Sequence, residues 1–392
     1  MSTCRSRCEP LRSLAEAAAV TAADAAATIR APEFWRRWQR SVWPCWPPVE
    51  WARSSQERGM TKRIFGAGLT LVLALALSIH AQDKPESLLL GEFELAEKDA
   101  VIDGDTVRVT GLKSSLRLLC LDAEETFKNA SDRKAAVSDF EAYREAKEAA
   151  SEMPVKYATF VGEEGRDFAV KFFEGIKKVR LEYDTLNRKV DYYGRNLCYI
   201  FATPKGAGEE KNYNVELVRA GLSPYSMKYG HSRRFRDKFE AAEKEARDAK
   251  RGIWSDKPRG YRDYDRRLKW WSERADQAER FEQKHREDKS AIMLGDDDTA
   301  EKLKAAVGKE VTLLGGVLEA NGLFPDEKQP RVMLGHREKQ DVAVRFADRK
   351  AYDKAKPEGC RGYFVVVKGV LQFDEKTGYS LTLSDAKDFT KA

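Results

Sequence analysis

Histidine is scarce in this sequence, with four residues among 392. So few imidazoles disfavour a mechanism built on a histidine cluster or on histidine-bound zinc. Cysteine is sparse as well, and beyond residue 59 only three remain: Cys120, Cys198 and Cys360. Their wide spacing gives neither a disulfide framework nor a zinc motif, and their apolar neighbours favour buried thiols.

A large excess of charge of one sign is also missing. Lysine and arginine number 70 against 64 acidic residues, a formal net charge of +6. This mild basicity permits a polyanionic partner without demanding one. Hydrophobic residues make up 42% of the chain, enough for packed cores, and its length predicts two or three domains.

Long apolar runs are rare, and the clearest extends from Ile64 to Ile79. A basic start at Met60 precedes it and His80-Ala81 follows it, as in a secretory signal peptide over residues 60–81. A membrane anchor is the alternative, but the run is shorter than the roughly 20 apolar residues of a span. We therefore expect a secreted or periplasmic protein without stable membrane association after cleavage. On this hypothesis Met60 is the true start, and residues 1–59 are a disordered, non-native upstream extension.

The remainder divides by composition into three parts. Residues 88–256 alternate strand-like and helix-like pieces, which predicts a small β-barrel with helices. Phe235, Phe239, Ala242 and Ala246 recur at helical spacing and predict one apolar helical face. Residues 127–160 interrupt this unit with a charged, alanine-rich stretch that we interpret as a solvated helical insertion. Residues 257–299 are highly charged and predict a helical linker that ends at an acidic loop, Gly295–Asp298.

The last part, residues 300–392, changes character. Five short strands are predicted between turn residues: Val311–Ala320, Arg331–Gly335, Asp341–Phe346, Gly362–Phe373 and Tyr379–Ser384. Five strands in some ninety residues fit a second closed barrel of the OB type. Its aromatic and basic side chains could capture single strands, whereas protein docking or a purely structural role remains the alternative.

Candidate chemistry lies in three short motifs of the first barrel. Asp103-Gly-Asp105 places two carboxylates at the start of a strand. An apolar strand beginning at Arg117 ends in Asp122 and Glu125, and the motif Asp-Tyr-Tyr-Gly-Arg ends at Arg195. Oxygen ligands without histidine favour Ca²⁺ or Mg²⁺ over zinc. Forked arginines suit a phosphate that gains charge, and a carboxylate beside the metal can activate water. The set predicts phosphodiester hydrolysis, although each motif alone is a common turn.

Residues 88–256 resemble the thermonuclease (staphylococcal-type nuclease) family. The matching motifs are Ile-Asp-Gly-Asp-Thr at 102–106, Arg-Leu-Leu-x-Leu-Asp-x-x-Glu-Thr at 117–126, Asp-x-Tyr-Gly-Arg at 191–195 and Gly-Ile-Trp-Ser at 252–255. The resemblance implies a five-stranded OB-type barrel with helices. It also implies Ca²⁺-dependent endonucleolytic cleavage of DNA or RNA to products with a 3′-phosphate, by a monomer.

The resemblance also implies roles for single residues. Asp105 and Asp122 would bind Ca²⁺ through carboxylates and Ala123 through its main-chain carbonyl. Glu125 would act on the attacking water. Arg117 and Arg195 would bind the phosphate, and Asp103 would lie beside the metal and support its ligands. Tyr193 and Tyr229 would bind the substrate.

The sequence departs from the family pattern at several places. Ala123 and Glu124 replace a threonine and a proline, and we expect Glu124 to loosen the backbone before Glu125. Tyr192 replaces a lysine, and Met227 replaces one of two base-stacking tyrosines. The insertion falls where the family has a mobile loop, so it could act as a lid. The rival to an enzyme is therefore a weak or inactive scaffold that binds nucleic acid or protein.

Overall fold

A computed structural model describes residues 87–149, 154–256, 259–318, 322–335, 340–383 and 385–392. The predictions for residues 1–59 and for the signal peptide at 60–81 lie outside these residues. None of the helices in the described ranges is both long and apolar enough to cross a membrane.

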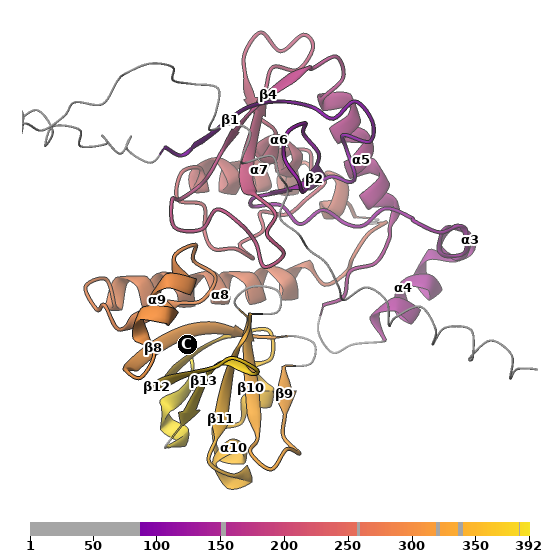
Figure 1. Cartoon of the computed structure of the whole chain (residues 1–392). Coiled ribbons are helices and arrows are strands. Elements are labelled where there is room, and N and C mark those ends of the chain that lie inside the picture. The colour runs from indigo at the N-terminus through magenta and orange to yellow at the C-terminus, as the bar shows by residue number, and fades with distance from the viewer. Residues whose placement is uncertain (1–86, 150–153, 257–258, 319–321, 336–339, 384) are drawn as a thin grey trace, which may run out of the picture. The chain divides into compact units, whose positions relative to one another are not determined.

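The first barrel is built from five strands, with a short sixth strand paired to the fifth (Figure 1). The strands are β1 (Leu89–Glu94), β2 (Thr106–Val107), β3 (Leu116–Leu118), β4 (Lys178–Glu182), β5 (Leu197–Ala202) and β6 (Lys211–Asn212). Their order is β1-β4-β5-β3-β2, and a bridge between Leu95 and Val109 brings β1 back to β2. β3 and β5 are parallel, while the other pairs are antiparallel. This is the OB-type barrel that the sequence predicts.

Burial explains why these strands form. All six residues of β5 are buried, so this central strand is apolar on both faces. The side chain of Asn214 secures it, because its amide donates to the carbonyls of Leu119 and Cys198 and accepts from the Ile200 amide. Cys198 is fully buried, and burial raises the pKa of its thiol. The cysteines act as the small buried residues that the sequence predicts.

Three helices pack around the barrel: α5 (Phe160–Phe172), α6 (Tyr213–Arg219) and α7 (Arg236–Asp248). Thr159 caps α5 by accepting from the Gly162 amide at 3.0 Å, and Asn212 caps α6. In α7, Phe239, Ala242 and Ala246 are buried at helical spacing, which confirms the predicted apolar face.

The insertion forms two helices, α3 (Ala130–Ser138) and α4 (Phe140–Glu148). The prediction that it is solvated is wrong for one face. Tyr143 and Tyr157 are only 6% and 5% exposed, and the Tyr143 ring contacts Phe127 and Phe140. The scattered aromatics of this stretch therefore form a small core of their own against the barrel.

The charged linker contains one long helix, α8 (Tyr264–Lys284), preceded by a 3₁₀ turn, η2 (Gly252–Trp254). Its apolar side is buried, with Trp271 2% exposed. Two α8 side chains bond to backbone carbonyls of the second barrel: Trp270 Nε1 to Gly362 at 2.9 Å and Gln277 Nε2 to Ala392 at 2.6 Å. The helix is thus a packed element as well as a connection.

The second barrel contains the five predicted strands: β8 (Glu310–Val317), β10 (Arg331–Gly335), β11 (Val342–Phe346), β12 (Phe364–Asp374) and β13 (Gly378–Leu383). They close in the order β8-β10-β11-β13-β12-β8, with β11 and β13 parallel. This is the same OB order as in the first barrel, with helix α10 (Arg349–Ala355) between the third and fourth strands.

Several short elements of this region were not predicted from the sequence. They are β7 (Ala291–Met293), α9 (Thr299–Ala306), β9 (Leu323–Phe324), η3 (Pro357–Cys360), η4 (Ala386–Asp388) and β14 (Phe389–Lys391). All have two to eight residues, too short for a clear periodic signal.

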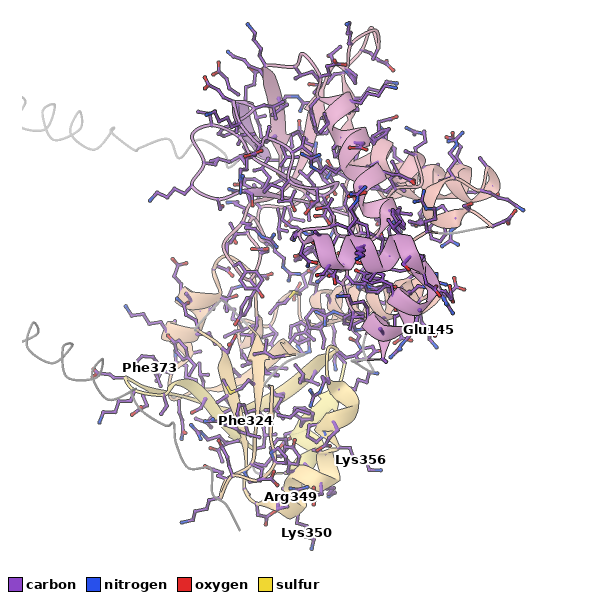
Figure 2. All side chains as sticks on the ribbon, turned by 90° about the vertical axis from the view of Figure 1, so that its right-hand side faces the viewer. Glu145, Phe324, Arg349, Lys350, Lys356 and Phe373 are labelled. Carbon is purple, nitrogen blue, oxygen red and sulfur yellow. The ribbon has the colours of Figure 1, made fainter. Side chains whose placement is uncertain are left out.

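The proposed nucleic-acid-binding side chains of the second barrel do not form one patch. Phe346 is fully buried in the core, whereas Phe373 is 52% exposed. Figure 2 shows Phe373 on one side of this barrel and Arg349 and Lys350 of α10 well away from it. The side chains proposed for strand capture are therefore dispersed between the core and separate parts of the surface.

Candidate active site

The loop before β2 is held in place by its own acids. The Asp105 amide donates to Asp103 Oδ1 at 3.1 Å. Asp105 Oδ1 accepts from Thr106 Oγ1 at 2.9 Å, and its Oδ2 accepts from the Ala123 amide at 3.0 Å. Tyr213 donates to the Gly104 carbonyl at 2.8 Å. The loop is thereby fixed to the segment that follows β3.

Arg117 joins the two carboxylates that are predicted to bind the metal. Its guanidinium forms ion pairs with Asp105 and with Asp122, whose Oδ1 lies 2.9 Å from an Arg117 terminal nitrogen. All three side chains are almost fully buried. Among the described residues, the buried Nε of Arg117 has no hydrogen-bond partner. One donor of this network is therefore left for a group that is not part of these residues.

The backbone around Asp122 is unusual. Cys120 has a left-handed conformation with φ of 63°, which turns the chain sharply two residues before Asp122. The Asp122 amide then donates to Ser223 Oγ at 3.0 Å. Burial alone would raise the pKa of Asp122, but Lys156 and Arg117 outweigh this effect and hold the pKa well below its usual range.

Glu125 is the most accessible of the site carboxylates, with a side chain 28% exposed. Its backbone pairs with Ala158, and its carbonyl packs against Gly162 at the start of α5. A Cβ on Gly162 would lie 2.1 Å from that carbonyl oxygen, so the close approach requires glycine. The carboxylate itself bonds to Lys128 Nζ at 3.0 Å.

The expectation that Glu124 loosens this backbone is wrong. Glu124 is 1% exposed, and its carboxylate accepts from the Tyr261 amide at 2.8 Å and from Tyr264 Oη at 2.6 Å. The Thr159 hydroxyl donates to its other oxygen. Three donors thus take the place of the proline ring in fixing the chain. Burial raises the pKa of Glu124, although these donors oppose the rise.

One site residue was missed by the sequence analysis. Lys156, near the end of the insertion, places Nζ 2.8 Å from Asp122 Oδ1 and 4.0 Å from Glu125 Oε1. No sequence signal separates it from the other lysines of this charged segment. Its place at the site follows from the tertiary packing of the insertion.

Arg195 is positioned by Asp191. The Asp191 carboxylate accepts from the backbone amides of Tyr193 and Arg195 and from Arg195 Nε at 2.8 Å. It thus holds both the turn and the guanidinium. Tyr193 is 67% exposed, with the Arg195 guanidinium 5.8 Å from its ring centroid. The motif therefore presents an arginine and an open aromatic ring side by side.

The Tyr229 phenol interacts electrostatically with both arginines of the site. Burial raises the pKa of this phenol, and Arg117 and Arg195 oppose the rise while Asp191 and Asp122 add to it. Arg117 pairs with Leu197, two residues after Arg195, and the Ala123 amide bonds to Asp105, so these backbone contacts bring the three motifs together.

The acids of the site repel one another. Burial, together with the charges of Asp105 and Glu125, raises the pKa of Asp103 to about 7. Neighbouring carboxylates and an all-oxygen donor set fit a hard cation such as Ca²⁺. In the described ranges, three potential metal-ligand atoms lie within 4.8 Å of one another only at His231, Asp276 and Glu279, which are not among the predicted site residues. Asp105, Asp122 and Glu125 are therefore less tightly gathered, and Arg117 and Lys156 contact them.

The site combines buried acids, two arginines and an accessible glutamate on one OB-type barrel. These groups are sufficient for hydrolysis of a phosphate ester. Comparisons with known proteins agree. Residues 115–256 match the family model described as staphylococcal nuclease homologue.

Curated relatives agree as well. The thermonuclease of Staphylococcus hyicus is 29% identical over 200 residues, covering 48% of this chain and 96% of the relative. An uncharacterized protein of Methanocaldococcus jannaschii is 31% identical over 160 residues, covering 40% and 69%. The endonuclease YncB of Bacillus subtilis is 29% identical over 161 residues, covering 40% and 60%. The chain therefore belongs to the staphylococcal nuclease homologue family, through this segment.

Proposed function

We propose that this chain is a Ca²⁺-dependent endonuclease that hydrolyses phosphodiester bonds of DNA or RNA and leaves 3′-phosphates. The observation that carries the proposal is the bridge of Arg117 between Asp105 and Asp122, with a buried Nε left without a partner among the described residues. Membership of a nuclease family supports the same reaction class.

Asp105, Asp122 and the Ala123 carbonyl would hold the metal. When bound, Ca²⁺ would supply positive charge that offsets the developing charge on the phosphate. Asp103 is not placed among the ligands, and its hydrogen bond from the Asp105 amide supports the loop instead.

The remaining chemistry belongs to side chains. Glu125 would orient a water molecule and accept its proton as the water oxygen bonds to phosphorus. The bond from phosphorus to the 5′-oxygen then breaks, and this oxygen takes a proton from solvent and leaves as a hydroxyl, while Glu125 returns its proton to solvent. Arg117 and Arg195 would stabilise the charged transition state through forked hydrogen bonds. Tyr193 and Tyr229 would contact the bound nucleotide.

We propose that the enzyme acts outside the cytoplasm. This location rests on the signal-peptide pattern at residues 60–81, after whose cleavage the mature protein would leave the membrane. Edman sequencing of the mature protein would test this point. A mature amino terminus within residues 1–59 would contradict it.

A non-catalytic scaffold is the second candidate. One observation favours it: Arg195 is paired with Asp191, and Glu125 with Lys128, so much of the site's charge is internally balanced. A protein that binds but does not cut could keep such a balanced site.

The decisive experiment compares cleavage of single-stranded DNA in Ca²⁺, Mg²⁺ and EDTA, with end-group analysis of the products. We expect Ca²⁺-dependent cleavage that Glu125→Gln and Arg195→Ala abolish. Glu358→Gln in the second barrel and Arg236→Ala in α7 make the same chemical changes at exposed positions and serve as controls. Intact substrate in Ca²⁺, with the fold preserved, would favour the scaffold.

A further inference from the structure

Lys156 occupies the outer side of Asp122. Its Nζ lies 2.8 Å from Asp122 Oδ1, the same oxygen that Arg117 contacts at 2.9 Å. Asp122 is buried with its side chain 2% exposed, whereas 32% of the Lys156 side chain is exposed. A metal that binds Asp122 from solvent must therefore approach the carboxylate that this ammonium already contacts.

The lysine is held there by its backbone. The Tyr157 amide donates to Tyr261 Oη at 3.1 Å, and Tyr261 Oη donates to the Tyr157 carbonyl at 2.9 Å. On the other side, an Arg267 terminal nitrogen donates to the Val155 carbonyl at 2.5 Å. Both neighbours of Lys156 are thus fixed by residues in or just before α8. Because the backbone on both sides of Lys156 is held, displacement of the ammonium from Asp122 would involve its partly exposed side chain.

When no metal is bound, the carboxylates of the site require a positively charged side chain as counter-ion. Arg117 contacts Asp105 and Asp122, Lys156 contacts Asp122 and Glu125, and Lys128 contacts Glu125, so these cations balance the three carboxylates. A buried carboxylate without a counter-ion is strongly unfavourable. A calcium ion sits about 2.3–2.6 Å from its oxygen ligands. At that distance it would lie beside an ammonium on the same carboxylate, and the two cations would repel.

We propose that Lys156 is the resident counter-ion of the metal site, and that Ca²⁺ binds Asp122 only by displacing its ammonium. Lys156 thereby sets the metal affinity of the site as a positioning residue supplied by the insertion. The inference rests on the proposed function, because it takes Asp122 as a metal ligand.

The test measures Ca²⁺ binding to the full chain by isothermal titration calorimetry, without substrate. Lys156→Met removes the charge and keeps the length of the side chain, and we expect it to tighten binding about 5-fold or more, as for a typical coupling between sites. Lys156→Arg keeps the charge and should stay near the wild-type affinity. Lys128→Met is the matched control, since Lys128 is 70% exposed and contacts Glu125 but not Asp122.

A second readout follows the amine itself. Trace acetylation read by mass spectrometry should label Lys156 several-fold faster in Ca²⁺ than in EDTA, while Lys350 of α10 is unchanged. Equal or weaker Ca²⁺ binding by Lys156→Met would overturn the inference and make Lys156 a support of the site. Absence of Ca²⁺ binding in every variant would overturn both the inference and the metal assignment. Ca²⁺ binding without cleavage would reject only the proposed activity.

Discussion

Tyr264 Oη donates a hydrogen bond of 2.6 Å to Glu124 Oε1, across 140 residues of sequence. Glu124 precedes the proposed base Glu125, and Tyr264 is the first residue of α8. The linker helix therefore helps to fix the backbone of the active site. This bond makes the region after the family segment part of the enzyme's framework.

Removal of the Tyr264 hydroxyl should destabilise the fold. Tyr264→Phe leaves a buried carboxylate with one donor fewer, and we expect a loss of about 1–3 kcal/mol in the free energy of unfolding. Urea titration would measure it. Tyr193→Phe is the control, because its ring is 67% exposed and its stability should not change. An equal effect of the two substitutions would argue against a framework role for the bond.

The contact of Gly162 with the Glu125 carbonyl predicts a defect in catalysis. Gly162→Ala would push this backbone aside, and a misplacement near 1 Å can cost roughly 100-fold in rate. Gly165→Ala in the same helix meets only ordinary contacts of 3.7 Å and more, so it should keep its activity. Cleavage assays of the two proteins, with circular dichroism as a check of folding, decide the matter.

Asp191 should matter through Arg195. Asp191→Ala removes the acceptor of two backbone amides and of the Arg195 guanidinium, so the arginine loses its position. We expect kcat to fall by roughly 100-fold. Ca²⁺ affinity should be unchanged, because Asp191 is not among the proposed ligands. Loss of metal binding in this variant would instead indicate a wider collapse of the site.

Asp103 gives the metal-free protein a dependence on pH. Its pKa is raised from 3.8 to about 7, so the folded state keeps a proton that the unfolded state loses in this range. Its contribution to stability therefore falls as pH rises from about 4 to 7, by at most about 1.4 kcal/mol per pH unit.

Asp103→Asn should abolish this contribution. In EDTA we expect the variant to match the wild type near pH 4 and to have the higher melting temperature at pH 8. Asp326→Asn, whose side chain is 94% exposed, makes the same change of charge without that pattern. A difference in melting temperature between wild type and Asp103→Asn that stays constant with pH would contradict the role of Asp103 in this pH dependence.

Local patterns in the sequence predicted much of the fold. The alternation around Val332 and Val344 located strands of the second barrel, and the spacing of Phe239, Ala242 and Ala246 located a helical face. These signals are local, since periodicity reflects which face of an element is buried. The acids and arginines of the candidate site could likewise be identified from the sequence, because they lie in short motifs.

Contacts between residues far apart in the sequence could not be predicted from it. The sequence predicted that Glu124 loosens the backbone, because its partners Thr159 and Tyr264 lie 35 and 140 residues away and no local pattern reveals them. Lys156 could not be distinguished from other lysines because its position depends on Tyr261 and Arg267. Such contacts depend on how elements pack, which no local pattern encodes.

The buried thiols have a practical consequence for spectroscopy. Cys120, Cys198 and Cys360 are inside the structure, and burial raises the pKa of each. With Cys4, Cys8 and Cys45 changed to serine, a cysteine introduced at Val137, which is 67% exposed on α3, would react selectively with a maleimide dye. The insertion could then be followed by fluorescence while metal and substrate are added.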